Sequence, residues 1–319
     1  MQLTLFPEPP EIQRLQYERD KLQRAQAAPT TEAGYAHDLK HFCAWCERMG
    51  RSALPATPDT LSLYITGLLT LGRTASTASR CAAGVAYAHR RRGLESPLTG
   101  EVRDILWGAR RLRGEKPRQM RPITLAQLRE MAASFAAEDT PLAARNRAIV
   151  VIGFASALRR SNLAALAFAD LDFREEGVAI HVRREKQDQG GRGRIIGIPC
   201  GAQAASCPVR CLEAWLGHRG RHAGPLFTRL DAGAVDRRAG LTGNAIRSVV
   251  KAAIGRIGLD SAEYGPHSLR AGFITEAGER GVGHLAIAGH TGHRSLDSLR
   301  RYFRPLDVFR ANACTALGM

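Results

Sequence analysis

Residues 266–270 read Pro-His-Ser-Leu-Arg and place a titratable ring close to a permanent cation. Proline is favoured at the first position of a helix, so this segment predicts a helix start with His267 and Arg270 on one face. The exposed amides and the dipole of a helix start also favour a phosphate group. The motif is weak by itself, since His-x-x-Arg recurs in this arginine-rich chain. Its other occurrences are residues 89–92, 181–184 and 218–221.

The sequence lacks the motifs that other kinds of phosphate chemistry require. The sequence has no GxxxxGKS or GxxxxGKT, so the glycine-rich stretch at 190–193 is interpreted as a hairpin loop rather than a phosphate cradle. It has no HExxH pair and no obvious acidic cluster for the metals of a two-metal nuclease. The remaining possibility is that cationic side chains act on a phosphodiester directly.

An ordered set of segments is far more specific than any single motif. Its intervals include 302 − 293 = 9 residues from a histidine to a tyrosine and 302 − 270 = 32 from an arginine to the same tyrosine. The segments are 157–163 (Ala-Leu-Arg-Arg-Ser-Asn-Leu), Lys186, 266–270, 291–295 (Thr-Gly-His-Arg-Ser) and 300–302 (Arg-Arg-Tyr). In content, order and spacing this set resembles the tyrosine recombinase (phage integrase) family.

The resemblance implies a covalent mechanism. Tyr302 is expected to attack the scissile phosphate and conserve the bond energy in a phosphotyrosyl ester, so no ATP, metal or cofactor is expected. Arg159 and Arg270 match the geometry of the non-bridging oxygens, on which charge builds up. The family implies that Lys186 protonates the departing 5′-oxygen. His267 suits acid–base assistance on the tyrosine side, and His293 a hydrogen bond to the phosphate.

Three positions leave alternatives. His290 precedes the Gly-His pair, but only His293 keeps the family interval to Tyr302. Tyr264 lies near the helix start and is interpreted as a packing or capping residue rather than a nucleophile. Asn162 stands where the family usually has an acidic residue that supports the active site. Because asparagine can hydrogen-bond but not neutralise charge, weaker arginine orientation or a slower rate is expected.

Composition agrees with a polyanionic partner. The 319 residues carry a formal charge of +16 and a pI near 10.3, which favours nucleic acid or an anionic membrane surface. The longest apolar run, around 148–158, is too short to span a bilayer, and residues 1–10 lack the features of a secretion signal. We therefore expect no membrane contact and a bacterial cytoplasmic, nucleoid-associated location.

Seven cysteines in a chain of this size favour reduced thiols over a disulfide framework. Cys43 and Cys46 form a CxxC, but they lie on or beside a helical apolar stripe, which favours core packing. A second group fits no compact zinc spacing, so a structural use is again expected. It consists of Cys200, Cys207, Cys211, His218 and His222.

Patterning divides the chain into four parts. Residues 1–29 form an N-terminal extension with a short polar helix, in which Ile12 and Leu15 are among the few apolar residues. Residues 30–113 predict four helices, and 114–122 a basic linker rich in glycine and proline. Residues 123–319 form a mainly helical second domain that ends in a tail, 305–319. There, strands around 178–182 and 195–198 predict a β-hairpin, and everything after about 208 predicts helices.

The expected fold class is therefore mainly α with a small β-hairpin sheet. The resemblance implies an all-α core-binding domain and an α+β catalytic domain that close as a C-shaped clamp on duplex DNA, in the simple two-domain layout of Cre-like and Xer-like recombinases. It also implies a tetramer on two recombination sites, with the tail docked in trans. The resemblance is equally consistent with integration, excision, inversion, resolution and transposition. The expected DNA contacts are Arg90, Arg91, Arg92, Lys116, Arg118, Arg121, Arg183, Arg184 and Arg192.

Two rival functions use the same observations. A type IB topoisomerase shares the nucleophile and the cationic set, and differs in whether the ligated strand belongs to another duplex. A catalytically decayed DNA-binding accessory protein is the second rival, which Asn162 keeps open. Retention of Tyr302 and the cationic residues argues against decay.

Overall fold

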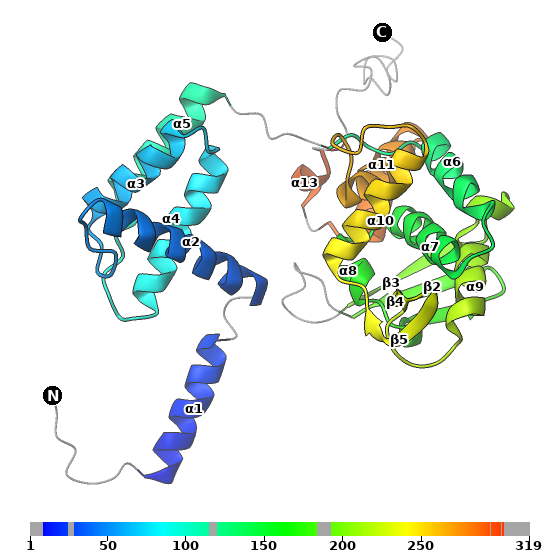
Figure 1. The fold of residues 1–319 in the computed structure, drawn as a ribbon, viewed down its shortest axis with the longest axis horizontal. Helices are drawn as coiled ribbons and strands as arrows, with labels where there is room; N and C mark the ends of the chain where they lie inside the picture. Colours follow the sequence, from blue (N-terminus) through cyan, green and yellow to red (C-terminus); the bar gives the residue numbers. More distant parts are fainter. Residues whose placement is uncertain are drawn as a thin grey trace. The chain divides into compact units, whose positions relative to one another are not determined.

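A computed structural model describes residues 9–24, 29–114, 120–183, 193–293, 295–300 and 302. The chain divides into two compact units, Met1–Arg118 and Gln119–Met319, each of which is described by itself (Figure 1). Some of the predicted site residues lie outside the described residues. These are Lys116, Arg118, Arg184, Lys186, Arg192 and the tail 305–319.

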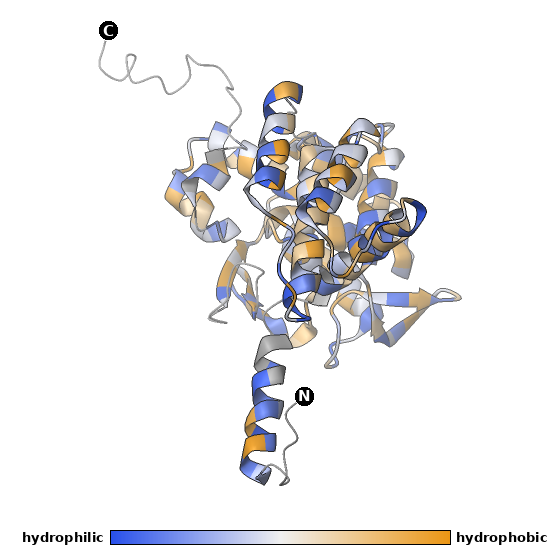
Figure 2. Cartoon of the chain, turned by 90° about the vertical axis from the view of Figure 1, so that its left-hand side faces the viewer, coloured by the Kyte–Doolittle hydropathy of each residue, from blue (hydrophilic) through white to orange (hydrophobic). Residues whose placement is uncertain are grey.

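The first unit is entirely helical over the residues that the structure describes. Phe42, Ile65 and Val85 are fully buried at the centre of its core, to which four of the helices contribute. The N-terminal helix is mostly hydrophilic (Figure 2), and its Ile12 and Leu15 are exposed. The helices are α1 (Pro10–Arg24), α2 (Pro29–Arg48), α3 (Pro58–Thr70), α4 (Ala75–Arg90) and α5 (Gly100–Arg113).

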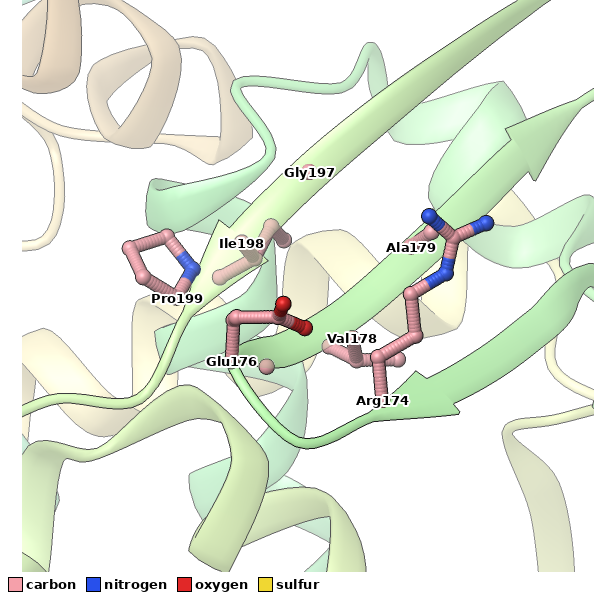
Figure 3. Close-up of a pocket in the computed structure, with 8 residues that line it drawn as sticks. Arg174, Glu176, Val178, Ala179, Gly197, Ile198 and Pro199 are labelled. Atoms are coloured by element: carbon pink, nitrogen blue, oxygen red, sulfur yellow. The ribbon is translucent and has the colours of Figure 1, made fainter.

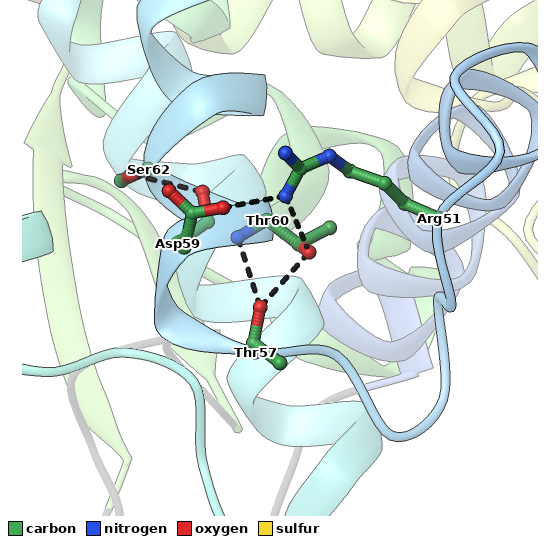
Figure 4. Close-up of polar contacts among 5 residues, drawn as sticks. All are labelled: Arg51, Thr57, Asp59, Thr60 and Ser62. Atoms are coloured by element: carbon green, nitrogen blue, oxygen red, sulfur yellow. Dashed lines mark hydrogen bonds and ion pairs between the residues drawn. The ribbon is translucent and has the colours of Figure 1, made fainter.

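Side chains fix the start of α3 (Figure 4). The hydroxyl of Thr57 accepts a hydrogen bond from the amide of Thr60 at 3.1 Å, which satisfies one of the unpaired donors of the first turn. Nη1 of Arg51 reaches Asp59 at 2.5 Å and the hydroxyl of Thr60 at 3.2 Å. Ser62 donates back to the carbonyl of Asp59 at 2.9 Å. The loop before α3 is thereby tied to its first turn.

The second unit packs its helices around α7. Residues 148–152 of α7 are all buried, so this helix is apolar on every side and forms the centre of the core. It contacts α6, α9, α10 and α11. The helices are α6 (Leu125–Ala136), α7 (Pro141–Ala155), α8 (Arg160–Ala165), α9 (Pro208–Arg219), α10 (Gly243–Arg256), α11 (Pro266–Glu279), α12 (His284–Thr291) and α13 (Leu296–Arg300).

Two small antiparallel sheets complete this unit. One has the order β1-β2-β3, with Ile180 opposite Ile196, and the other pairs β4 with β5. The strands are β1 (Leu171–Arg174), β2 (Gly177–Val182), β3 (Arg194–Pro199), β4 (Thr228–Asp231) and β5 (Ala234–Gly240). The mainly α fold with a small sheet is confirmed, and β2 and β3 are the predicted hairpin.

The expectation of only helices after residue 208 is wrong, because β4 and β5 lie there. The third strand β1 was not predicted either. β1 has only four residues, and in β5 three consecutive charged residues, 236–238, interrupt the alternation of apolar and polar side chains by which a strand is recognised. A register shift between Thr228 and Arg229 further obscures the period of two.

The strand ends of the larger sheet surround a shallow hollow (Figure 3). Arg174, Glu176 and Pro199 are among its lining residues, and none of the predicted catalytic residues is. A Cβ at Gly177 would lie 2.2 Å from the carbonyl oxygen of Ile198, so only glycine permits these strands to approach this closely. The hollow is a consequence of strand packing.

The chain enters the second unit directly against α11. The amide of Arg121 donates to the carbonyl of Glu263 at 2.9 Å, and that of Ile123 donates to the carbonyl of Ser268 at 3.0 Å. A Cβ at Gly272 would lie only 1.9 Å from the carbonyl oxygen of Ile123. The entering segment therefore lies against the helix that carries His267 and Arg270.

Candidate active site

The turn between α7 and α8 presents Arg159. Its geometry depends on Ala157, which is fully buried and has φ +49°, an unusual conformation for a residue with a Cβ. The buried hydroxyl of Ser156 donates to the carbonyl of Ile152 at 2.6 Å and accepts from the amide of Leu158 at 3.4 Å. Arg159 then immediately precedes α8, at the N-cap position.

Arg270 is the fifth residue of α11 and has 1% of its surface exposed. Nη1 donates to the carbonyl of Ala157 at 2.7 Å, so the second arginine holds the turn that presents the first. Nη2 lies 3.0 Å from Nε2 of His293. A guanidinium has only donors, so Nε2 of His293 is the acceptor.

His293 follows α12, which ends at Gly292 with φ +70°. Nδ1 lies 2.7 Å from the hydroxyl of Thr291, which itself donates to the carbonyl of Ile287 at 2.6 Å. Desolvation, followed by the charges of Arg270 and Arg159, lowers the pKa of His293 to about 4. The ring is therefore neutral at pH 7.

Tyr302 meets two histidine rings. Its hydroxyl lies 2.8 Å from Nε2 of His267, and its ring centroid is 5.6 Å from those of His267 and His293. The tyrosine ring packs on the apolar cluster that contains Ile274 and Leu299. Desolvation, then the charges of Arg270 and Arg159, lowers the pKa of His267, so this ring is neutral at pH 7.

Five of the six predicted catalytic residues thus converge within the second unit. They are Arg159, His267, Arg270, His293 and Tyr302. The sixth, Lys186, lies outside the described residues. Two supporting contacts were not predicted, namely the hydroxyl of Thr291 on His293 and the carbonyl of Ala157 on Arg270. Both residues begin segments recognised in the sequence, but neither contact has a signal there, because each depends on how the chain folds.

The three residues for which the sequence left alternatives lie in surroundings that differ from those of the proposed catalytic residues. His290 directs Nε2 to the carbonyl of Ala155 at 2.8 Å rather than to Tyr302. Tyr264 is 4% exposed and belongs to the hydrophobic core. Asn162 lies on α8 and accepts a hydrogen bond from the hydroxyl of Ser161 at 3.3 Å. Neither Tyr264 nor His290 is placed to replace its counterpart.

The described DNA-contact candidates differ in how they are held. Arg90 and Arg91 are exposed at the end of α4, and Arg92, also exposed, donates to its own helix at Ala88. Arg121 pairs with Glu263 at 3.1 Å and Arg183 with Asp170 at 2.5 Å. Carboxylate partners restrain these two guanidiniums without burying them.

The thiols are largely part of the core. Cys46 is 1% exposed, and burial raises its pKa. Burial also raises the pKa of Cys211 to about 11, while the sulfur of Cys207 accepts from the amide of Gly201 at 3.2 Å. Cys200 is exposed. Over the described ranges, no group of three or more His, Cys, Asp or Glu side chains could hold a metal ion.

Comparison with known protein families decides the class. Residues 122–307, more than half of the chain, match the model of the phage integrase family. The chain belongs to this family. An integrase/recombinase xerD homolog of Selenomonas ruminantium is 34% identical over 297 residues, covering 92% of this chain and 86% of that protein. Tyrosine recombinase XerC of Mycobacterium bovis (strain BCG / Pasteur 1173P2) is 30% identical over 285 residues, or 85% and 87% of the two chains.

Solved structures share the fold of this phage integrase family member. The Tn1549 transposon integrase in complex with transposon right end DNA superposes with a TM-score of 0.64 at 15% identity, over 95% of this chain and 98% of that one. A lambda integrase dimer bound to a COC′ core site gives 0.59 at 19% identity, over 91% and 94%. The chain is thus a tyrosine recombinase, and the topoisomerase and decayed-protein alternatives are not favoured. No helix among the described residues has the length and apolarity to span a membrane.

Proposed function

We propose that this recombinase cleaves and rejoins DNA at specific sites through a 3′-phosphotyrosyl intermediate on Tyr302. The observation that carries the proposal is the 2.8 Å contact between the Tyr302 hydroxyl and Nε2 of His267. A neutral imidazole accepts the phenolic proton as the oxygen attacks phosphorus, and the 5′-oxygen leaves. Religation is the reverse transesterification, so no external energy source is needed.

The two arginines stabilise the transition state in this proposal. The forked donors of each guanidinium match the geometry of the non-bridging oxygens. Because these charges are already in place, no free energy is needed to reorient them as the transition state forms. The contact of Arg270 with the Ala157 carbonyl supports this role, because it sets one guanidinium beside the turn of the other. Asn162, on the helix that follows Arg159, can donate or accept hydrogen bonds but brings no negative charge.

Lys186 and His293 complete the chemistry. We assign to Lys186 the protonation of the departing 5′-oxygen. His293 is assigned a hydrogen bond to the phosphate, which requires a proton on Nε2. A bound phosphate favours this, because its charge opposes the effect of Arg270 and Arg159, which lower the pKa of the ring in the free protein. No cofactor or metal takes part in this scheme.

The proposed partner is duplex DNA carrying specific recombination sites, in the cytoplasm and at the nucleoid. After the N-terminal extension 1–29, residues 30–113 act as the core-binding domain. A basic linker, 114–122, connects them to the catalytic domain, 123–319. The two domains together close as a clamp on the DNA. The cations at the end of α4 support this. Two sites assemble a tetramer, in which each tail 305–319 docks on a neighbouring subunit.

A nicked suicide substrate tests the proposal. Wild type should form a covalent adduct on a denaturing gel, with or without EDTA, since arginines supply the charge that metals supply elsewhere. Tyr302→Phe should bind the same DNA with little loss and form no adduct. An adduct formed by the Phe variant at the wild-type rate, or cleavage that only magnesium restores, would overturn the mechanism. Tyr264→Phe is the matched control and should cleave normally once its folding has been verified.

A further inference from the structure

His290 connects the elements that carry the catalytic residues. Its Nε2 lies 2.8 Å from the carbonyl oxygen of Ala155, the last residue of α7. Since a carbonyl only accepts, Nε2 carries the proton. The ring stacks on Phe273 of α11, with centroids 4.4 Å apart and planes 17° apart. Its own backbone carbonyl accepts a hydrogen bond from Arg194, the first residue of β3.

The contact lies at the start of the turn between α7 and α8, which presents Arg159. Ala155 is two residues before Ala157, whose carbonyl holds Arg270, and four before Arg159. Carbonyls at a helix C-terminus lack partners within the helix, so an outside donor there determines how the chain leaves it. The turn is thus held by a histidine at one end and by Arg270 near the other.

We propose that His290 is a positioning residue: its Nε2–H bond to Ala155 fixes the turn that presents Arg159 and sets the carbonyl that holds Arg270. The inference rests on the proposed function of those arginines. Desolvation and the charges of Arg194 and Arg270 lower the pKa of His290, which agrees with a neutral donor ring. His290 does not contact the reacting atoms in this role.

Three variants separate the hydrogen bond from packing. His290→Phe retains a ring for stacking on Phe273 but lacks the donor, whereas His290→Gln retains an N–H. Leu285→Gln, at a side chain of α12 that is 78% exposed, is the matched control. Single-turnover cleavage of the suicide substrate should fall about 10-fold in the Phe variant and recover to within about 3-fold in the Gln variant. DNA affinity should change less than about twofold, and the control should cleave as wild type.

A substrate change tests the link to the arginines. A methylphosphonate at the scissile position removes the negative charge that they stabilise, so the defect of His290→Phe should shrink on this substrate. A folded Phe variant that cleaves at the wild-type rate overturns the inference. So do equal losses in the Phe and Gln variants, an undiminished defect on methylphosphonate, or parallel losses of thermal stability and DNA binding. Failure of the proposed function is distinct, because wild type itself would then form no adduct.

Discussion

The hydroxyl of Tyr302 and Nε2 of His267 are 2.8 Å apart, although α12 and α13 separate the two residues along the chain. The pair joins the start of α11 to the end of the described chain. Because Tyr302 also packs on the apolar cluster that contains Ile274 and Leu299, its ring is held by apolar contacts as well as by the hydrogen bond. The proposed nucleophile and its proposed proton acceptor therefore face each other in the free protein.

The first prediction concerns pH. The pKa of His267 is below its ordinary 6.5, so the ring is neutral at pH 7 and becomes protonated only as the pH falls through that lowered value. The cleavage rate should therefore be flat near neutrality and fall on acidification, because imidazolium cannot accept a proton. His267→Gln should lose this acid limb and cleave about 100-fold more slowly at pH 7. Single-turnover rates from pH 5 to 8 measure both; an unchanged acid limb in the variant would assign it to another group.

The second prediction concerns the leaving group. Lys186→Ala should slow strand cleavage, because the 5′-oxygen then leaves without its acid. A 5′-phosphorothiolate substrate should restore the rate, since sulfur leaves without protonation. Arg183→Ala, which removes a cation three residues earlier in the sequence that is paired with Asp170, serves as the control and should show no such selective rescue. Equal defects on both substrates would move Lys186 from catalysis to DNA contact.

The third prediction concerns Ala157 and its φ of +49°. Replacing Ala157 by glycine relieves a left-handed strain of about 1 kcal/mol, which raises the free energy of unfolding. Two effects lower it: the loss of a buried methyl group costs about 0.8 kcal/mol, and the greater freedom of glycine in the unfolded chain costs about 0.4–1 kcal/mol. Ala157→Gly should therefore stay within about 1 kcal/mol of wild type in stability. Ala157→Val should cost roughly 2–3 kcal/mol, as a β-branched residue tolerates this region poorly.

Denaturant unfolding measures both Ala157 variants, and cleavage assays separate stability from positioning. Because the Ala157 carbonyl holds Arg270, the valine variant should lose activity even where it is still folded. A valine variant as stable and as active as wild type would show that the turn adapts freely.

The fourth prediction concerns the tail. Truncation after Arg304 should leave a folded protein that binds single sites but assembles two-site complexes poorly. Burying Phe309 and Leu317 in a neighbour should contribute about 2 kcal/mol each, enough to affect assembly. Native gels with a two-site substrate, alongside thermal unfolding, provide the test, and Phe309→Ala should show a partial defect. A truncated protein that melts several degrees earlier yet forms normal synapses would place the tail on its own domain.

Local patterns predicted the local structure well. A cap followed by proline marks the start of α3, and the Thr124 capping box marks that of α6. His267 and Arg270 share the predicted helix start, and β2 and β3 follow the alternation of apolar residues. These features depend on neighbours in sequence, which periodicity and capping describe.

What depends on contacts across the fold could not be predicted. The approach of Arg270 to the Ala157 carbonyl joins residues 113 apart, and no pattern encodes it. The same holds for His290. Spacing favours His293 over it as the family histidine, but no pattern in the sequence indicates that its partner is Ala155 on another helix. Strands β4 and β5 were missed because tertiary pairing there overrides a weak local preference.

The contact between Ile123 and α11 has a mechanical consequence. With glycine at 272, the backbones lie so close that no side-chain cushion separates them, and the amide of Ile123 is bonded to Ser268, the neighbour of His267. The position of Ile123 is therefore coupled to the first turn of α11 through backbone contacts rather than through side chains that could adjust. A change in the path of the backbone at Ile123 would therefore require a matching shift at the start of α11, where His267 lies.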